Sequence, residues 1–396
     1  MLDVHDGQFG DHGRLGEHGR PDAHGRLDDP GKHGERGAPV PPAPQPGPAA
    51  RATTLARLRA NRRARNRRTA LTATVLGAAL LALLAASVLT GLRRVDPSDV
   101  LPAAFGLRTG LADYTIFRIR LPRALAALLS GALFGLSGAL YQRLIRNPLA
   151  TPDIVGISAG AGAGAATVLV LFPAIPSGSA PLAAVAALAG SFLLVAVVQA
   201  LSWRQGVDTY RLVLVGIGMS GLCTAYTNYL FSLADQHSMA LVLRWLVGSV
   251  NGATWEGVRI LALALAVCAA GALALGRSLS GLTLGDQLAT GLGTRVGRTR
   301  VAALLVGAAA AALATSVVGP IGFVSLVSGP IAARVAGVER ALALAPPVGA
   351  VLVLGADVLA QHAPVVSPVP TGVLTALIGA PYFVRLILRR GQGATS

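Results

Sequence analysis

Residues 118–166 read RIRLPRALAALLSGALFGLSGALYQRLIRNPLATPDIVGISAGAGAGAA. The apolar run from Ala124 to Tyr141 is long enough for a membrane helix, because about 20 mostly apolar residues cross roughly 30 Å of hydrocarbon. A second run, rich in Gly and Ala, follows at once. Small residues such as Gly131, Gly135 and Gly138 allow neighbouring helices to approach closely. The stretch therefore predicts a membrane protein with several packed spanning helices.

The composition of the whole chain agrees with this prediction. Of its 396 residues, 53% are hydrophobic and 13% are charged, whereas about 25% of residues are charged in a typical soluble protein. The net charge is +16, and outside residues 1–68 most arginines stand at the ends of apolar runs. This is the pattern of topology signals in membrane proteins and not of a nucleic-acid surface. Membrane lipid is therefore an expected partner, and nucleic acid is not.

The N-terminal segment differs from the rest. Residues 1–50 repeat His-Gly-Arg and then run into prolines, a composition that predicts disorder. A metal-binding tail is the alternative, but one His per six residues sets no fixed ligand geometry. Residues 51–68 carry eight Arg and no acid, which is typical of a cytoplasmic segment beside anionic lipid. We predict a disordered basic cytoplasmic tail over 1–68, a transmembrane domain over 69–390 and a short C-terminal tail over 391–396.

Apolar length and breaking residues predict ten spanning helices. Their ranges are 69–92, 124–145, 154–172, 182–201, 212–231, 258–275, 301–317, 322–336, 348–360 and 372–388. An even number of spans returns the C-terminus to the side of the N-terminus, which the basic cluster places in the cytoplasm. The predicted fold class is an all-α polytopic membrane protein with about 10 transmembrane helices.

The opening stretch also resembles a family signature. That signature runs RLPR, a small-residue helix and then Q-x-L-x-R-N-P-L-A-x-P-x-x-x-G-x-S-x-G-A, as in the bacterial FecCD-type permeases for iron-siderophores, haem and vitamin B12. Five further motifs that resemble the family follow in order: RLVLVGIGMSG (211–221), RWLVGSVNGATW (244–255), LGDQLATGLG (284–293), VGPIGFVSLVSGPIAAR (318–334) and VPTGVLTALIGAPYFVRLILRR (369–390). The resemblance covers about residues 118–390. It implies a fold like that of the vitamin B12 importer permease, in the bacterial cytoplasmic membrane.

The resemblance implies a function and partners as well. It indicates the permease subunit of an ATP-binding-cassette importer, with ferric siderophores the expected substrate. The implied partners are a cytoplasmic ABC ATPase, an extracytoplasmic substrate-binding protein, and a second permease copy or a sister permease. The chain itself is not expected to be an enzyme, since its only Gly-Lys pair, Gly31 and Lys32, lacks the upstream Gly of a phosphate-binding loop. No cofactor is expected.

The loop between the sixth and seventh spans corresponds to the family's ATPase coupling element. A short helix there has an acidic residue near its N-terminus, which the helix dipole favours, and Gly residues that end it. The coupling candidates are Gly285, Asp286, Ala289, Gly291 and Gly293. An ordinary surface loop is the alternative from spacing alone.

Arg120 and Arg123 resemble the family pair that meets acidic residues on the substrate-binding protein. Pro122 suits the opening of a helix, and no acid lies within residues 118–129. We therefore expect both side chains to point out of the membrane toward an external anion, with snorkelling at the interface as the alternative. Gln361 stands where the family has a third Arg, so docking there is expected to be weaker or to use Arg118 or Arg108.

The resemblance assigns the translocation path to the fifth and tenth helices. Thr209 and Tyr210, just before the fifth helix, are the candidates for a cytoplasmic gate. The chain departs from the family at Ser325, at Gly329 and Pro330 in place of Pro-His, and at Pro368 in place of a Glu. These departures leave the predicted fold unchanged and bear on which substrate is carried.

Several motifs are better explained by structure. Gly216, Gly218 and Gly221 spell GxGxxG, but inside an apolar helix they favour close packing over nucleotide binding. Ser158 lies in a GxSxG frame without the strand, turn and helix of a nucleophile elbow. His237 and His362 are expected to be loop residues, and no metal site is predicted. Cys223 and Cys268 lie in apolar runs and form no CxxC motif.

Asp357 and the choice of transport mechanism stay open at this point. Asp357 is an acid within an apolar run, and it resembles a fixed Ala-Asp pair of the family, so a hydrogen-bonding role is at least as well supported as a transport role. The alternative function is a stand-alone secondary transporter or channel without an ATPase partner. Few acids lie within the spans, which argues against ion coupling. A membrane enzyme is disfavoured because no His, Cys or acid cluster is present.

Overall fold

The computed structural model describes residues 48–90, 114–172, 179–203, 209–283, 285–362 and 369–392. The chain divides into two units, Met1–Ala56 and Arg57–Ser396, and the packing reported below lies within the second. Helices in the first half of the chain are α1 (Pro48–Leu89), the π-helix η1 (Tyr114–Arg120), α4 (Leu121–Ile145), the 3-10 turn η2 (Pro152–Val155), α5 (Ile157–Leu171), α6 (Ser179–Ser202) and α7 (Thr209–Leu233). Those in the second half are α8 (Gln236–Val247), α9 (Trp255–Leu282), α10 (Asp286–Gly291), α11 (Val296–Val318), α12 (Val324–Ala336), η3 (Val338–Arg340), α13 (Ala341–His362) and α14 (Thr371–Gln392).

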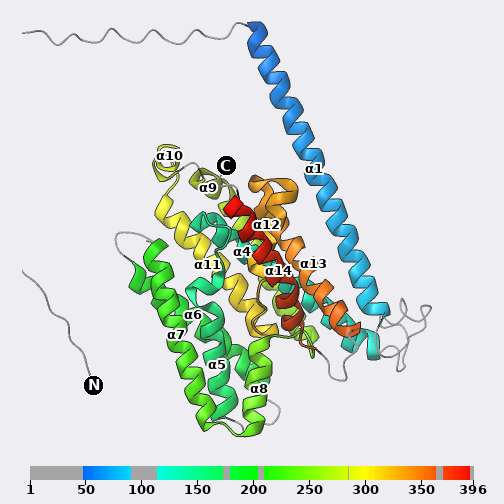
Figure 1. Ribbon diagram of the computed structural model, residues 1–396, viewed down its shortest axis with the longest axis vertical. Coiled ribbons are helices and arrows are strands. Elements are labelled where there is room, and N and C mark those ends of the chain that lie inside the picture. Colours follow the sequence, from blue (N-terminus) through cyan, green and yellow to red (C-terminus); the bar gives the residue numbers. More distant parts are fainter. Residues whose placement is uncertain are drawn as a thin grey trace, which may run out of the picture. The chain divides into compact units, whose positions relative to one another are not determined.

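The all-helical membrane fold is confirmed. Each of the predicted spans overlaps one helix, namely α1, α4, α5, α6, α7, α9, α11, α12, α13 or α14. Among the described residues, 6 helices are long and apolar enough to cross a membrane, and three shorter apolar helices lie at 157–171, 324–336 and 371–386. Figure 1 shows α4 to α14 packed as one bundle, with α1 at its side. Within the bundle, α4 packs against α9, α11, α12 and α13.

Three features differ from the expectations. α8 forms within the stretch expected to be an external loop, capped by Asp235, whose carboxylate accepts a hydrogen bond from the Ser238 amide at 3.2 Å. This bond lowers the pKa of Asp235 from its ordinary value. α9 continues to Leu282, beyond the predicted end at residue 275. Helix α1 begins at Pro48, so residues 48–68 are helical where disorder was expected; residues 1–47 lie outside the described part.

The sequence explains why α1 starts early. Ala, Leu and Arg are among the best helix formers, and residues 51–68 consist largely of these three types. The segment also leads without Gly or Pro into the first apolar span, so nothing ends the helix between them. A basic composition therefore did not imply a disordered backbone next to the membrane.

The small-residue helix α4 lies at the centre because its glycines admit other backbones. A Cβ atom at Gly131 would lie 2.4 Å from the Gly349 carbonyl oxygen on α13, and one at Gly135 would lie 2.3 Å from the Ala345 oxygen. Such contacts forbid any larger side chain. In the membrane, where the hydrophobic effect does not drive helices together, close approach of this kind supplies packing energy. The Gly pattern of the opening stretch therefore fixes which helix is innermost.

Gln142 of α4 donates hydrogen bonds to backbone carbonyls of α12, one of which lacks its usual helical donor. Pro330 lies within α12 and has no N–H to donate to the carbonyl of Leu326. The Gln142 Nε2 donates to that oxygen at 3.0 Å and to the Ser325 oxygen at 3.2 Å. Gly329 leaves room for the amide, because a Cβ there would lie 1.9 Å from the Gln142 Oε1. Gly329 and Pro330, the departures from the family, therefore act together with Gln142.

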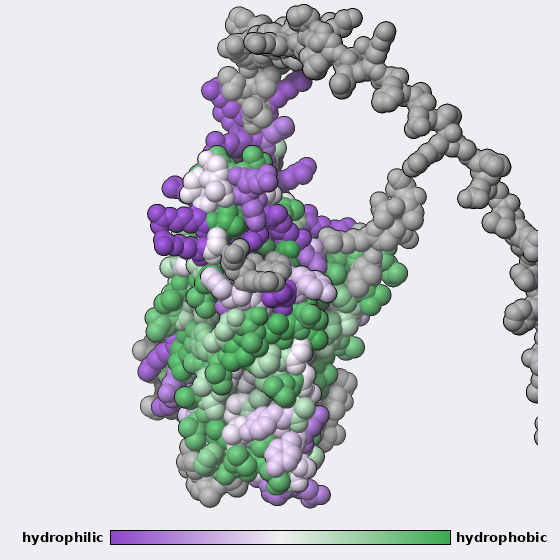
Figure 2. Space-filling view, turned by 90° about the vertical axis from the view of Figure 1, so that its left-hand side faces the viewer, coloured by the Kyte–Doolittle hydropathy of each residue, from purple (hydrophilic) through white to green (hydrophobic). Residues whose placement is uncertain are grey.

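The surface divides along the bundle. Figure 2 shows a broad hydrophobic band over the body of the molecule and hydrophilic residues gathered toward its upper end, the end at which α10 lies in Figure 1. We call this the α10 end. A band of exposed apolar residues bounded by polar ones is the surface expected of helices in contact with lipid tails.

Candidate functional site

A short hairpin at the α10 end is the clearest candidate. Helix α10 joins α9 to α11 and lies beyond the ends of both (Figure 1). Gly285 before it has φ 105° and Gly293 after it has φ 81°. Both values lie in the region that residues with a Cβ rarely adopt. The two glycines therefore let the chain turn sharply into and out of α10.

Two arginines from other elements hold this hairpin through Asp286. The Arg146 Nη2 donates to Asp286 Oδ1 at 2.9 Å and to the Leu282 carbonyl oxygen at 2.5 Å. The Arg300 Nη2 lies 2.9 Å from Asp286 Oδ2. Arg146 follows α4 and Arg300 lies on α11, so Asp286 links α10 to two helices of the bundle. Neither arginine was predicted as a partner, since neither is near Asp286 in sequence.

The hairpin presents apolar side chains outward. Ala289 is buried, whereas Leu288 is 63% exposed and Leu292 is 70% exposed. Nothing lies within 4 Å of a Cβ built at Gly291. Exposed apolar residues on a restrained polar hairpin are typical of a surface that another protein covers. The structure thus brings the predicted coupling residues together in one projecting element.

Asp357 and Arg123 form a partly buried ion pair at the opposite end of the bundle. The Arg123 guanidinium donates from Nε to both Asp357 oxygens, at 3.1 and 3.0 Å, and from Nη2 to Oδ1 at 2.9 Å. Asp357 is fully buried, with 0% exposure. It also accepts from Gln361 Nε2 at 2.8 Å and from Thr371 Oγ1 at 3.1 Å. The hydrogen-bonding role suggested for Asp357 therefore agrees with its contacts.

Arg120 likewise points inward. Its Nη1 donates to the Val88 and Leu89 carbonyl oxygens at 2.8 and 3.3 Å. These carbonyls end α1, where a helix leaves acceptors unsatisfied and favours a cation. Both side chains were expected to point out of the membrane toward an external anion, but the end of α1 and Asp357, distant in sequence, supply internal partners for Arg120 and Arg123. Contact of the pair with a binding protein stays a prediction.

The gate candidates lie at the start of α7. Thr209 is the first residue of this helix, and Tyr210 is 76% exposed. Exposed apolar residues continue along α7 and along α14, the two helices expected to line the path; examples are Leu214, Ile217, Leu222, Leu377 and Leu388. These faces remain uncovered within the single chain.

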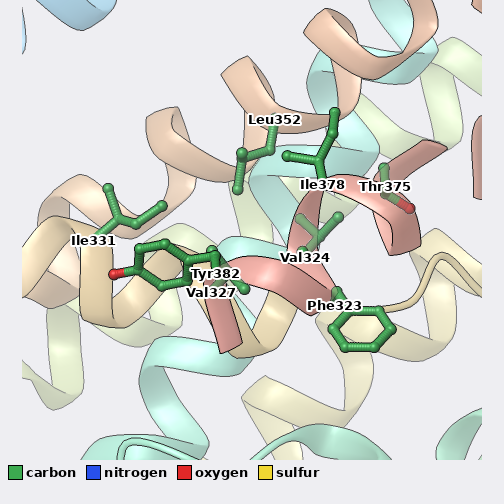
Figure 3. Close-up of a pocket in the computed structure, with 9 residues that line it drawn as sticks. Phe323, Val324, Val327, Ile331, Leu352, Thr375, Ile378 and Tyr382 are labelled. Atoms are coloured by element: carbon green, nitrogen blue, oxygen red, sulfur yellow. The ribbon is translucent and has the colours of Figure 1, made fainter. Parts of the chain in front are cut away.

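A small apolar cavity lies beside α14. Its volume is about 80 Å³, and it is lined by residues of α12, α13 and α14. Figure 3 shows Val324, Val327 and Ile331 of α12 facing Ile378 and Tyr382 of α14. Ligand pockets are about 300–1,000 Å³, so a metal chelate does not fit here. The cavity is space between packed helices and not a substrate site.

Other sequence motifs have structural explanations. A Cβ at Gly216 would lie 1.8 Å from the Ile154 oxygen, so this member of the GxGxxG motif permits close packing of η2 on α7. The Ser158 hydroxyl donates to Asp153, five residues earlier. No group of three or more His, Cys, Asp or Glu that could hold a metal ion occurs in the part of the chain that the structure describes.

Comparisons with known proteins give relatives along most of the chain. It is 34% identical to the ferric enterobactin transport system permease protein FepG of Escherichia coli (strain K12), over 76% of this chain and 91% of that protein. It is 35% identical to the Fe(3+)-citrate import system permease protein YfmE of Bacillus subtilis (strain 168), over 79% of this chain and 93% of that protein. It is 36% identical to the hemin transport system permease protein HmuU of Yersinia pestis, over 69% of this chain and 83% of that protein.

The fold has a solved counterpart. A metal-chelate type ABC transporter in an inward-facing conformation superposes with a TM-score of 0.70 and 26% sequence identity, covering 80% of this chain and 98% of that one. The sequence pattern of the FecCD transport family matches residues 79–389, from the last third of α1 to near the end of α14. This chain belongs to the FecCD transport family.

Proposed function

We propose that this chain is the membrane-spanning permease subunit of an ABC importer that moves ferric siderophores inward, with ATP hydrolysed by a separate subunit. Relatives named for ferric enterobactin, Fe(3+)-citrate and achromobactin transport support this substrate class. Most exposed arginines lie on α1 or at the α10 end, and Arg118, Arg244 and Arg259 are the exposed exceptions elsewhere. The positive-inside rule then assigns the α10 end and both termini to the cytoplasm.

The observation that carries the proposal is the α10 hairpin. A permease driven by a separate ATPase needs an element that projects from the membrane and transmits force without bending. Asp286 restrains α10 through Arg146 and Arg300, while Leu288 and Leu292 remain exposed. The hairpin is therefore both restrained toward the bundle and apolar toward the cytoplasm, as an ATPase docking element must be.

Two further partners complete the proposal. The exposed faces of α7 and α14 suit a second permease, either a copy of this chain or a sister protein. Two different Fe(3+) dicitrate transport system permease proteins, FecC and FecD of Escherichia coli (strain K12), are both relatives, which supports the sister arrangement. For the substrate-binding protein, Arg118 is the better docking candidate, since it is exposed whereas Arg120 and Arg123 are held inside.

The decisive test uses Gly291, where the space for a side chain is open. Gly291→Asp adds a charge to the apolar docking surface, and Gly291→Ala adds only a methyl group at the same position. We expect Gly291→Asp to reduce copurification of the ATPase and ATP-driven uptake of ferric siderophore by tenfold or more, because a buried unpaired charge costs several kcal/mol. Gly291→Ala should retain both, and both variants should be inserted in the membrane in normal amounts.

Normal ATPase binding and uptake by Gly291→Asp would refute the docking assignment. The same proteoliposomes separate the proposed function from a stand-alone transporter. Uptake that proceeds without the ATPase subunit and follows an ion gradient would identify a secondary transporter, and uptake that requires ATP and the ATPase supports the importer.

A further inference from the structure

The arginines that line a cleft at the α10 end have no role in the function proposed above. The cleft is an open space of about 810 Å³ between the end of α9 and the start of α11. Arg277 of α9, Arg295 before α11 and Arg298 of α11 line it, together with the hydroxyl residues Ser278 and Thr294. Its volume is within the range of about 300–1,000 Å³ found for ligand sites.

The charge of this cleft is not neutralised from within. Arg277, Arg295 and Arg298 are exposed and, among the described residues, take part in no ion pair. Asp286, the acid of the adjoining hairpin, pairs with Arg146 and Arg300 instead. Three positive charges around one cleft with hydroxyl donors suit an anion with several oxygens, such as a phosphate.

Apolar surface leads directly into the cleft along both helices. On α9, Leu263, Val267 and Leu273 are 67%, 63% and 81% exposed, and Arg277 follows Leu273 at the next helical turn of the same face. On α11, Leu305 is 50% exposed, and Arg298 lies seven residues before it on the same face. The exposed apolar faces of both helices thus end in arginines at the α10 end.

We propose that this cleft binds the phosphate headgroup of an anionic phospholipid, whose acyl chains lie along the exposed faces of α9 and α11. Basic pockets between membrane helices hold anionic headgroups in this way. A soluble phosphate would use the arginines but leave the leucines without a partner. A soluble ATPase could reach the arginines but not Leu263 or Val267, which lie farther from the α10 end along α9.

The site adjoins the coupling hairpin. Leu292 and Gly293 line the cleft and directly follow α10, so a bound headgroup would contact the turn that leaves the hairpin. The lipid site itself does not depend on the proposed function, whereas any effect of lipid on coupling does. The test below therefore takes lipid binding as its main readout and copurification of the ATPase as a second, separate one.

The experiment compares two lipids with the same dioleoyl chains, phosphatidylglycerol and phosphatidylcholine, bound to the purified full-length chain and counted by native mass spectrometry. We expect a preference for phosphatidylglycerol of about tenfold or more. The variant Arg277→Gln/Arg295→Gln/Arg298→Gln should lose the preference. The same positions changed to Lys should keep it, since a lysine retains the charge.

The matched control, Arg118→Gln/Arg244→Gln/Arg259→Gln, removes equal charge from exposed arginines outside the cleft and should keep the preference. Equal loss in the control, or a preference that survives in the cleft variant, would overturn the proposal.

Displacement of phosphatidylglycerol by inorganic phosphate alone would identify a soluble-anion site instead. Loss of ATPase copurification with lipid binding unchanged would identify a protein-docking groove. If the triple variant does not fold, the single variants Arg277→Gln and Arg298→Gln are measured instead. Each is expected to weaken the preference for phosphatidylglycerol severalfold.

Discussion

Several side chains in this protein form hydrogen bonds or ion pairs with residues that are far away in sequence. Arg123 and Asp357 are 234 positions apart, and Gln142 reaches the carbonyl of Leu326 across 184 positions. Local sequence cannot show either contact. It shows only that Arg123 has no acid nearby, and the expectation of an external anion followed from that incomplete view.

Breaking the buried ion pair should be costly. Arg123→Gln leaves the Asp357 carboxylate buried without its main counter-charge, and removal of one member of such a pair typically destabilises by about 3–5 kcal/mol. We expect a marked fall in the thermal unfolding temperature of the purified protein. Arg118→Gln, which changes an exposed arginine two residues before Arg120, should leave that temperature unchanged.

The double change Arg123→Gln/Asp357→Asn separates a structural role from external docking. If the pair acts internally, the double variant should recover part of the stability lost in Arg123→Gln, because no unpaired charge is left buried. Normal stability of Arg123→Gln combined with weaker capture of the substrate-binding protein would instead support the docking role.

Gly329 and Gln142 provide a second test. Gly329→Ala should force the Gln142 amide away from Ser325 and Leu326, and the unsatisfied carbonyls should cost about 1–3 kcal/mol. In a Gln142→Ala background there is no amide to displace. The same Gly329→Ala change should then cost little, so the free energies of unfolding should be clearly non-additive. Additive effects would show that the two residues do not act together.

At the scale of helices, the sequence was sufficient for position and insufficient for boundaries. Apolar length placed a span on each of these helices, because the bilayer sets the length of a span physically, but α9 and α13 extend seven residues beyond the predicted bounds. It missed α8, an amphipathic helix outside the spans, and the early start of α1. The family resemblance indicated the residues of α10, but the arginines that restrain it come from α11 and from the turn after α4, which periodicity cannot reveal.

The restraint on α10 can be measured directly. Asp286→Asn weakens the contacts to Arg146 and Arg300, each of which contributes about 0.2–1 kcal/mol at this exposure. We expect amide hydrogen exchange in residues 286–294 to accelerate severalfold and ATPase binding to weaken, while the helices of the bundle keep their protection. Gln287→Ala, at the neighbouring exposed position, is the control. Unchanged exchange in Asp286→Asn would mean that the glycine turns alone hold the hairpin.

For the molecule as a whole, α1 stands apart from the other spans. Only 11% of its most apolar window is buried, against 83% for the span that includes α4. Polar contacts attach it at two places instead. Arg120 binds its last carbonyls, and near the middle of the helix Arg340 contacts the Arg65 oxygen at 2.8 Å, Asn66 and Thr69. An ion pair of 2.8 Å between Arg65 and Glu339 adds to the second attachment.

This arrangement predicts which part of the N-terminal segment the transporter can lose. The attachment of α1 to η3 begins at Arg65, so deletion of residues 2–47 removes none of these contacts. We expect membrane insertion and uptake of ferric siderophore to stay near wild type. Arg340→Ala with Glu339→Ala should instead make the residues around Arg65 more accessible to protease, because this exposed part of α1 loses its partners. A large loss of uptake in the deletion variant, restored by added metal ions, would contradict the prediction and favour a metal-binding role for the histidines of residues 1–47.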